Sequence, residues 1–131
     1  EGNHDSESKK YIKSFSSWSQ LKEIKYNGRR FVLCHYPMRS WNGSNNGSVL
    51  LFGHCHNRCK TYNLSFDVGV DVPENNYAPV SVDEIIRRIK IRELEMKANG
   101  RIKEEEINGK KHLVYYQDDC EFLAPGRARN K

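Results

Sequence analysis

Two short apolar runs limit the fold of this chain more than any other feature. Residues 31–34 (FVLC) and 49–53 (VLLFG) are apolar at successive positions, so an extended backbone would present apolar side chains on both faces. Such segments suit central strands of a sheet that is covered on both sides. Pro37 ends the first run and favours an extended Tyr36. We therefore predict two buried strands, joined by a loop that includes residues 39–48.

A hairpin and a third strand extend the predicted sheet. Asn27-Gly28 lies between apolar runs, and both residues accept positive φ, so residues 21–26 should pair with residues 30–34. Residues 64–70 (LSFDVGV) place apolar side chains at every second position, which predicts another strand.

One amphipathic helix follows. Ser81 and Glu84 form a capping-box pattern, and apolar residues recur behind it at helical spacing: Val82, Ile85, Ile86 and Ile89. This pattern predicts a helix over residues 82–98, with Gly100 just beyond its end.

The composition changes after residue 100. A second Asn-Gly pair at 108–109 predicts a charged hairpin, and we expect a disordered basic tail at 124–131. The elements together predict a mixed α/β (α+β) fold. We divide the chain into residues 1–98 and an unassigned hairpin and tail, residues 99–131.

The bulk composition is that of a globular domain. The chain has 131 residues, of which 37% are hydrophobic and 30% charged, enough for one domain with a core. No apolar run reaches the length of a membrane span, and no secretory signal is present. The missing initiator Met indicates a processed chain or a partial sequence. The net charge of +5 fits either an anionic partner or a solvated basic surface.

The cysteines are few and unevenly spaced. Cys34, Cys55, Cys59 and Cys120 form no C-x-x-C pair and no evident disulfide framework. We therefore expect free thiols and a cytoplasmic protein.

Three histidines follow the two buried strands. His35 ends the first strand, and His54 and His56 follow the second, on one side of it if the chain stays extended there. Cys55 would then face away. If the two strands are neighbours, their ends bring the three histidines to one rim, where they could bind a metal ion. The alternatives are histidines with ordinary hydrogen bonds, or a closed zinc site formed by cysteines and one histidine, which the alternation disfavours.

Three short blocks, taken in order, resemble the calcineurin-like metallophosphoesterases. They are GNHD at residues 2–5, HYP at 35–37 and GHCH at 53–56. The HYPMRSWNGSNNGS loop and the DVGVD and APVSVDEI segments look like a bacterial and phage branch of that family, and the similarity covers residues 2–89. The resemblance implies a four-layer α-β-β-α sandwich, of which this chain would supply the C-terminal half.

The resemblance also implies a site with two divalent metal ions, Mn, Fe or Zn. It assigns Asn3, His35 and His54 to one ion and His56 to the other. Two such ions clamp the attacking and leaving oxygens of a displacement at phosphorus.

Catalytic and substrate-binding roles follow by the same resemblance and from loop position. His4 would stabilise or protonate the leaving oxygen, and Asp5 would orient its ring. Because the loop at 39–48 joins two strands that end in ligands, we expect Arg39 or Asn46 to contact a phosphate oxygen. A solvated Arg39 is the alternative.

The family pattern also contains D-x-H and G-D-x-x-D blocks, and neither occurs in this chain. The expected ligands are all neutral, whereas carboxylates normally balance a divalent ion. Asp67 or Asp71 could lie nearby, but no pattern places them. We therefore expect the C-terminal half of a larger domain, whose partner is the missing N-terminal half. Half of the fold would leave sheet edges and an apolar face open.

We predict a metal-dependent phosphoesterase that hydrolyses phosphate mono- or diesters and is incomplete in this chain. One alternative is a non-catalytic fragment that binds metal or a partner chain. Another is a basic nucleic-acid-binding module at residues 101–131, although the acidic run at 104–106 interrupts its positive charge. No membrane partner is expected, and nucleic acid is expected only as a substrate.

Overall fold

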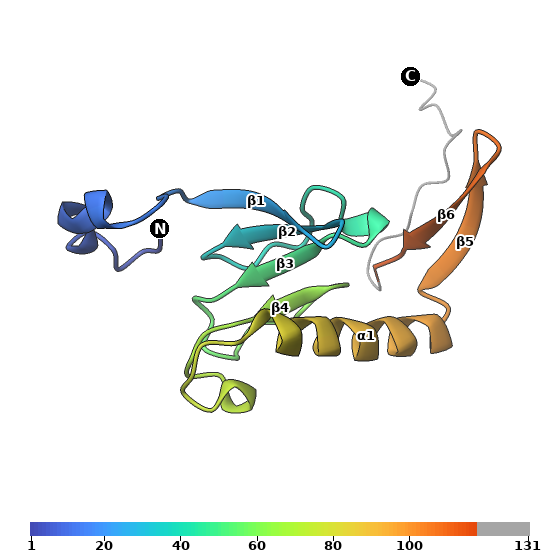
Figure 1. Ribbon diagram of the computed structural model, residues 1–131. Helices are drawn as coiled ribbons and strands as arrows, with labels where there is room; N and C mark the ends of the chain where they lie inside the picture. Colours follow the sequence, from blue (N-terminus) through green and yellow to red (C-terminus); the bar gives the residue numbers. More distant parts are fainter. Residues whose placement is uncertain (118–131) are drawn as a thin grey trace, which may run out of the picture.

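The computed structural model describes residues 1–117 and shows a mixed α+β fold, as predicted (Figure 1). Within these residues the regular elements are one α-helix (α1), two sheets and three short 3-10 helices (η1–η3). In chain order the elements are η1 (Ser8–Ser14), β1 (Leu21–Tyr26), β2 (Arg29–Cys34), η2 (Ser44–Asn46), β3 (Val49–Phe52), β4 (Ser65–Asp67), η3 (Pro73–Asn75), α1 (Val82–Ala98), β5 (Ile102–Ile107) and β6 (Lys110–Tyr115).

The larger sheet has the order β1-β2-β3-β4. β1 and β2 form the predicted antiparallel hairpin, with Asn27 and Gly28 at φ 48° and 78°. β2, β3 and β4 are parallel, so their carboxyl ends meet at one edge of the sheet. Figure 1 shows the N-terminus at this same edge.

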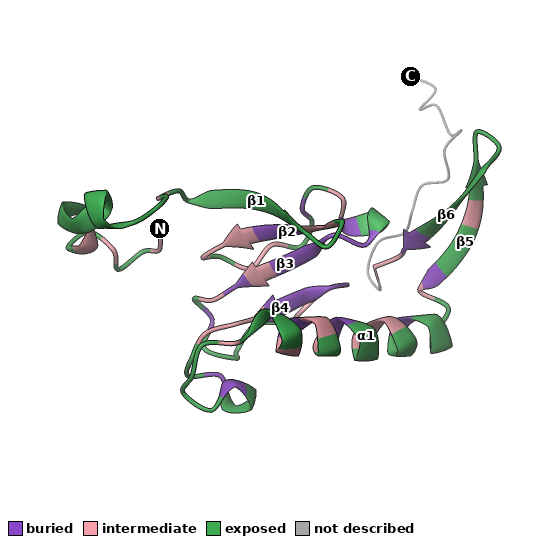
Figure 2. Ribbon diagram, in the orientation of Figure 1, coloured by how far each residue is buried: buried purple, intermediate pink, exposed green. Residues whose placement is uncertain are grey.

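Both faces of the sheet are covered, as the two apolar runs require. α1 and the second hairpin pack on one face, where the main core forms from Phe31, Val49, Leu64, Phe66, Ile85, Ile89, Met96, Ile102 and Tyr115. On the other face Val32, Leu50 and Phe52 pack with Trp41, a residue of the β2–β3 connection. The expected open apolar face is therefore closed within this chain. The edge strand β1 is different, because all six of its residues are exposed (Figure 2).

α1 has the predicted bounds. The Ser81 hydroxyl accepts a hydrogen bond from the Glu84 backbone N–H at 3.2 Å, which satisfies one of the free N–H groups at the helix start. The reciprocal bond of a capping box is replaced, because the Glu84 carboxylate binds Arg87 and Arg88. Gly100, at φ 68°, follows the end of the helix.

β4 is shorter than predicted. It spans Ser65–Asp67, and the chain turns directly afterwards because the Asp67 carboxylate accepts the Gly69 N–H at 3.0 Å. Val70, predicted to lie on the apolar face, is 47% exposed. The expectation of a strand up to residue 70 is therefore wrong beyond Asp67.

The charged hairpin at 108–109 is present as β5 and β6. Its residues Ile102 and Tyr115 are buried in the same core as α1 and the sheet. The predicted basic tail and Cys120 lie outside the described residues. Within residues 1–117, no helix combines the length and the apolar character that crossing a membrane requires.

Candidate functional site

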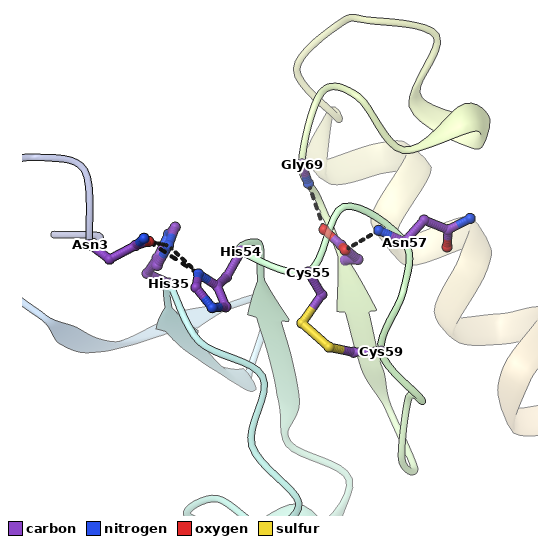
Figure 3. The surroundings of a disulfide bond; sticks show 8 residues. Asn3, His35, His54, Cys55, Asn57, Cys59 and Gly69 are labelled. Atoms are coloured by element: carbon purple, nitrogen blue, oxygen red, sulfur yellow. Dashed lines mark hydrogen bonds between the residues drawn. A yellow bond between two sulfur atoms is a disulfide. The ribbon is translucent and has the colours of Figure 1, made fainter.

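The carboxyl ends of β2 and β3 bring two histidines close to an asparagine from the N-terminal segment (Figure 3). Nε2 of His35 lies 2.7 Å from Oδ1 of Asn3 and 3.1 Å from Nδ1 of His54. Nδ1 of His54 also lies 3.1 Å from Oδ1 of Asn3. These three atoms, here called the Asn3–His35–His54 triangle, belong to the three residues that were assigned to one ion.

Either hydrogen bonds or a bound cation can hold this triangle together. The amide oxygen only accepts, and each neutral imidazole has one protonated and one unprotonated nitrogen. If both ring nitrogens of the triangle carry protons, both N–H groups can donate to the amide oxygen of Asn3, which has two lone pairs. If only one carries a proton, a lone pair of the other faces the amide oxygen. A cation placed on the triangle attracts all three lone pairs at once.

The spacing of the triangle fits one metal ion. Neighbouring ligands of an octahedral ion with bonds of about 2.1 Å lie about 3.0 Å apart, and the three atoms are separated by 2.7 to 3.1 Å. No group of three His, Cys, Asp or Glu side chains in residues 1–117 is arranged to hold an ion. The triangle has three donors only because an amide oxygen joins the two imidazoles.

The surroundings of His35 favour its neutral form. Burial lowers the pKa of this half-buried imidazole, and the nearby His54 lowers it further. The Asp5 carboxylate acts in the opposite direction, but the net shift of the pKa is downward. A metal ligand must be an unprotonated imidazole, so this environment prepares His35 for binding.

Small residues and one aromatic ring position the two imidazoles. A side chain at Gly2 would place its Cβ 2.7 Å from the His35 ring, so this glycine leaves the space that the ring occupies. Tyr36 packs edge-on against His35 and His54, at centroid distances of 5.0 and 4.8 Å. The Gly53 N–H donates to the His35 carbonyl at 3.0 Å and ties the two strand ends together.

His56 lies outside the triangle. His54 and His56 have left-handed backbones, with φ of 69° and 49°, so the chain turns after β3 instead of remaining extended. The alternation that was expected to align both imidazoles therefore fails. Nδ1 of His56 instead makes a short contact with the Asp71 carboxylate, which lowers the pKa of Asp71.

Cys55 and Cys59 form a disulfide bond, which corrects the prediction of free thiols. The tight turn after β3 brings the Cα atoms of these two residues within 5.6 Å of each other. Figure 3 shows the disulfide on the same loop as His54, directed away from the triangle. The closed zinc site needs thiolates, so the oxidised pair cannot supply it. Cys34 is a free, half-buried thiol.

Asp67 fixes the loop from the other side. Its carboxylate accepts the backbone N–H of Asn57 at 3.1 Å and that of Gly69 at 3.0 Å. The sequence indicated Asp67 and Asp71 only as carboxylates that could lie nearby. In the structure one supports the loop and the other holds His56, and neither reaches the triangle through a described contact.

The two proposed catalytic residues share one turn but are not paired. The Asp5 carboxylate accepts the Gly2 backbone N–H at 2.6 Å, so it closes the turn at residues 2–5. It was expected to orient the ring of His4, and no contact between the two is described. His4 is exposed, and its charge helps to lower the pKa of His35, so it lies within electrostatic reach of the triangle.

The proposed substrate contacts lie elsewhere. Because β2 and β3 are parallel, residues 35–48 must cross the sheet from its carboxyl edge to its amino edge. Only the start of this connection is therefore near the triangle. The Arg39 guanidinium lies over the ring of Tyr62 at 5.9 Å, and Asn46 lines a groove with Lys25 at the amino edge. The structure brings neither residue to the triangle.

Comparisons with known proteins identify no relative. No protein-family model matches the sequence, and neither a curated protein nor a solved structure gives a match.

Proposed function

We propose that this chain carries part of a metal-dependent phosphoesterase site of the calcineurin-like type. The observation that carries the proposal is the Asn3–His35–His54 triangle, whose donor atoms lie 2.7 to 3.1 Å apart. The sequence resemblance independently assigns these three residues to a common ion. The substrate class is a phosphate mono- or diester, with nucleic acid included only as a substrate.

In this proposal the metal ligands of the chain belong to two ions. Asn3, His35 and His54 hold one divalent ion. His56 suits a second ion, because a hydrogen bond from its Nδ1 to Asp71 leaves the Nε2 lone pair free to coordinate, a common arrangement for metal-binding histidines. When bound, two such ions clamp and polarise the oxygens around phosphorus.

His4 is the proposed proton donor to the leaving oxygen. Its exposed ring is carried on the turn that also carries Asn3, so a substrate bound at the triangle would lie within its reach. Asp5 closes this turn through the Gly2 N–H and positions His4 through the backbone. General acid catalysis of this kind contributes about 10²–10⁴-fold to a rate.

In our proposal, the carboxylates that balance the charge of the metal ion come from a segment outside residues 1–131. The donors of the triangle are neutral, and a divalent ion in such a site is normally balanced by carboxylates. We propose that a segment with D-x-H and G-D-x-x-D supplies them and completes a four-layer sandwich. The exposed β1 supports this, since Leu21, Ile24 and Tyr26 are 47%, 39% and 40% exposed.

The test is hydrolysis of 4-nitrophenyl phosphate with Mn²⁺, by residues 1–131 alone and with such a segment supplied in fusion or in trans. We expect very weak turnover alone and strong, metal-dependent turnover together. In the complete form, His4→Ala should lower kcat and leave the metal content unchanged, whereas His54→Ala should lower both. Strong turnover by residues 1–131 alone would refute the proposal that a further segment supplies part of the site.

A non-catalytic role is the second candidate, favoured by the exposed edge strand β1. Exposed strand edges pair readily with other chains. In that case the added segment should bind tightly without producing hydrolysis. The same experiment therefore separates the two functions.

A cytoplasmic location remains part of the proposal. Cytoplasmic thiols are kept reduced, so Cys55 and Cys59 would be dithiols there for much of the time.

A further inference from the structure

The loop that carries His54 and His56 is closed by the Cys55–Cys59 disulfide into a ring of five residues. His54, which precedes this ring, and His56 and Asn57 within it have positive φ, a conformation that is uncommon for non-glycine residues. The proposed function assigns this disulfide no role.

We propose that Cys55–Cys59 is a thiol-exchange site, and that its reduction by a dithiol disassembles the Asn3–His35–His54 triangle. The inference rests on the proposed metal function for its consequence. The exchange chemistry and the movement of His54 do not depend on it.

The exchange would begin at Cys59. Cys55 is 8% exposed and buried, whereas Cys59 is exposed and lies between Arg58 and Lys60. An incoming thiolate can reach the exposed Cys59 sulfur more easily than the buried Cys55 sulfur, and neighbouring cations attract this anionic nucleophile.

The reaction balances as a two-electron exchange. A thiolate of the dithiol attacks Sγ of Cys59, the bond between the two cysteines breaks, and the Cys55 sulfur leaves as a thiolate that takes up a proton. The second thiol of the reductant then attacks the mixed disulfide and releases Cys59. The products are two cysteine thiols and the oxidised, cyclic disulfide of the reductant.

Few other contacts hold the ring once the disulfide opens. The backbone bonds within it are local, from Cys55 N–H to the Gly53 carbonyl at 2.7 Å and from Arg58 N–H to the Cys55 carbonyl at 2.9 Å. Two contacts to other parts of the chain remain, from the Asn57 N–H to the Asp67 carboxylate and from the exposed His56 ring to the exposed Asp71 carboxylate. The His54 side chain is exposed, so beyond the triangle it is held mainly by its contact with the Tyr36 ring, and in our proposal it leaves the triangle when the adjacent ring opens.

The first measurement is the affinity for Mn²⁺, a cation that thiols bind poorly, followed through the electron paramagnetic resonance of the free ion. The oxidised protein is compared with the dithiothreitol-reduced protein after the reductant has been removed, and with the Cys55→Ser, Cys59→Ser double variant. We expect weaker binding in both open forms, up to the limit of about 30-fold set by the closure entropy of a five-residue ring. Cys34→Ser, which leaves the disulfide in place, is the matched control and should bind like the oxidised protein.

The second measurement needs no metal. In the metal-free protein, reduction should shift the imidazole carbon-bound proton signals of His54 and His35, and re-oxidation should restore them. Equal affinities in all forms, or histidine signals unchanged by reduction, would overturn the inference. If no form binds Mn²⁺, the proposed function fails. The histidine signals then decide alone whether reduction of the disulfide moves His54.

Discussion

Adding one methyl group at Gly2 should weaken metal binding at least tenfold while the fold remains intact. The Cβ of Gly2→Ala would lie 2.7 Å from Nδ1 of His35 and 2.8 Å from Cε1. Ordinary contact begins near 3.4 Å, so the ring must retreat by about 0.7 Å. Metal–ligand distances tolerate only about 0.2 Å. We therefore expect at least a tenfold loss of affinity, or about 1.4 kcal/mol.

The assay is a Mn²⁺ titration, with the free energy of unfolding measured in parallel. Gly53→Ala is the matched control, because its Cβ would find its nearest neighbour, the His35 carbonyl, only at 4.0 Å and its backbone is not left-handed. It adds the same methyl group beside His54. Equal affinities for the two variants would refute the claim that the space above Gly2 positions His35 for binding.

Three further predictions concern the fold and the loop. Gly47→Ala should lower the free energy of unfolding by about 2–3 kcal/mol, because Gly47 has φ 76° and its Cβ would lie 2.9 Å from the Tyr115 ring; unchanged urea unfolding would contradict this. Burial and the hydrogen bond to Glu93 raise the pKa of Tyr115 to about 12, so its contribution to stability is complete below about pH 10 and is lost as the pH rises toward 12, by about 1–2 kcal/mol. Urea unfolding against pH should show this loss in the wild type and less of it in Tyr115→Phe, and equal slopes would refute it. Asp67→Ala should weaken Mn²⁺ binding severalfold, because the Asn57 N–H loses its acceptor, and an unchanged titration would show that this bond does not support the loop.

The strand and helix predictions succeeded where local patterns decide the structure. The Asn-Gly turns, the two apolar runs and the Ser81 cap act over a few residues, and each produced the expected element. β4 was overestimated because period-two alternation continues through residue 70, whereas the Asp67 carboxylate turns the backbone at Gly69.

The site predictions depended on the direction of the strands. His35 and His54 were expected to meet if the two strands were neighbours, and they do, because β2 and β3 are adjacent and parallel and end at the same edge. The same parallel pairing sends residues 35–48 across the sheet, which removes Asn46 from the site. No sequence pattern indicated that β2 and β3 are parallel, so the path of the connecting loop across the sheet was not predicted.

The position of His56 was predicted wrongly and the disulfide was missed, and the same turn explains both. The alignment of His54 with His56, and Cys55 facing away from them, assumed an extended chain after β3, and free thiols were expected from the cysteine spacing, whereas the backbone is left-handed at His54 and His56. A turn at this point separates the two imidazoles and folds Cys59 back onto Cys55. Two cysteines four residues apart, directly after a strand, are the signal that could have indicated such a turn.

The most direct test of the central claim is the ligand set of the Mn²⁺ ion bound by residues 1–131. Pulsed electron paramagnetic resonance detects nitrogens coordinated to the ion. We predict one ion per chain with two imidazole nitrogens, retained in His56→Ala and reduced to one nitrogen or lost in His54→Ala. An ion without coordinated nitrogen, or a His54→Ala variant that binds like the wild type, would contradict the account.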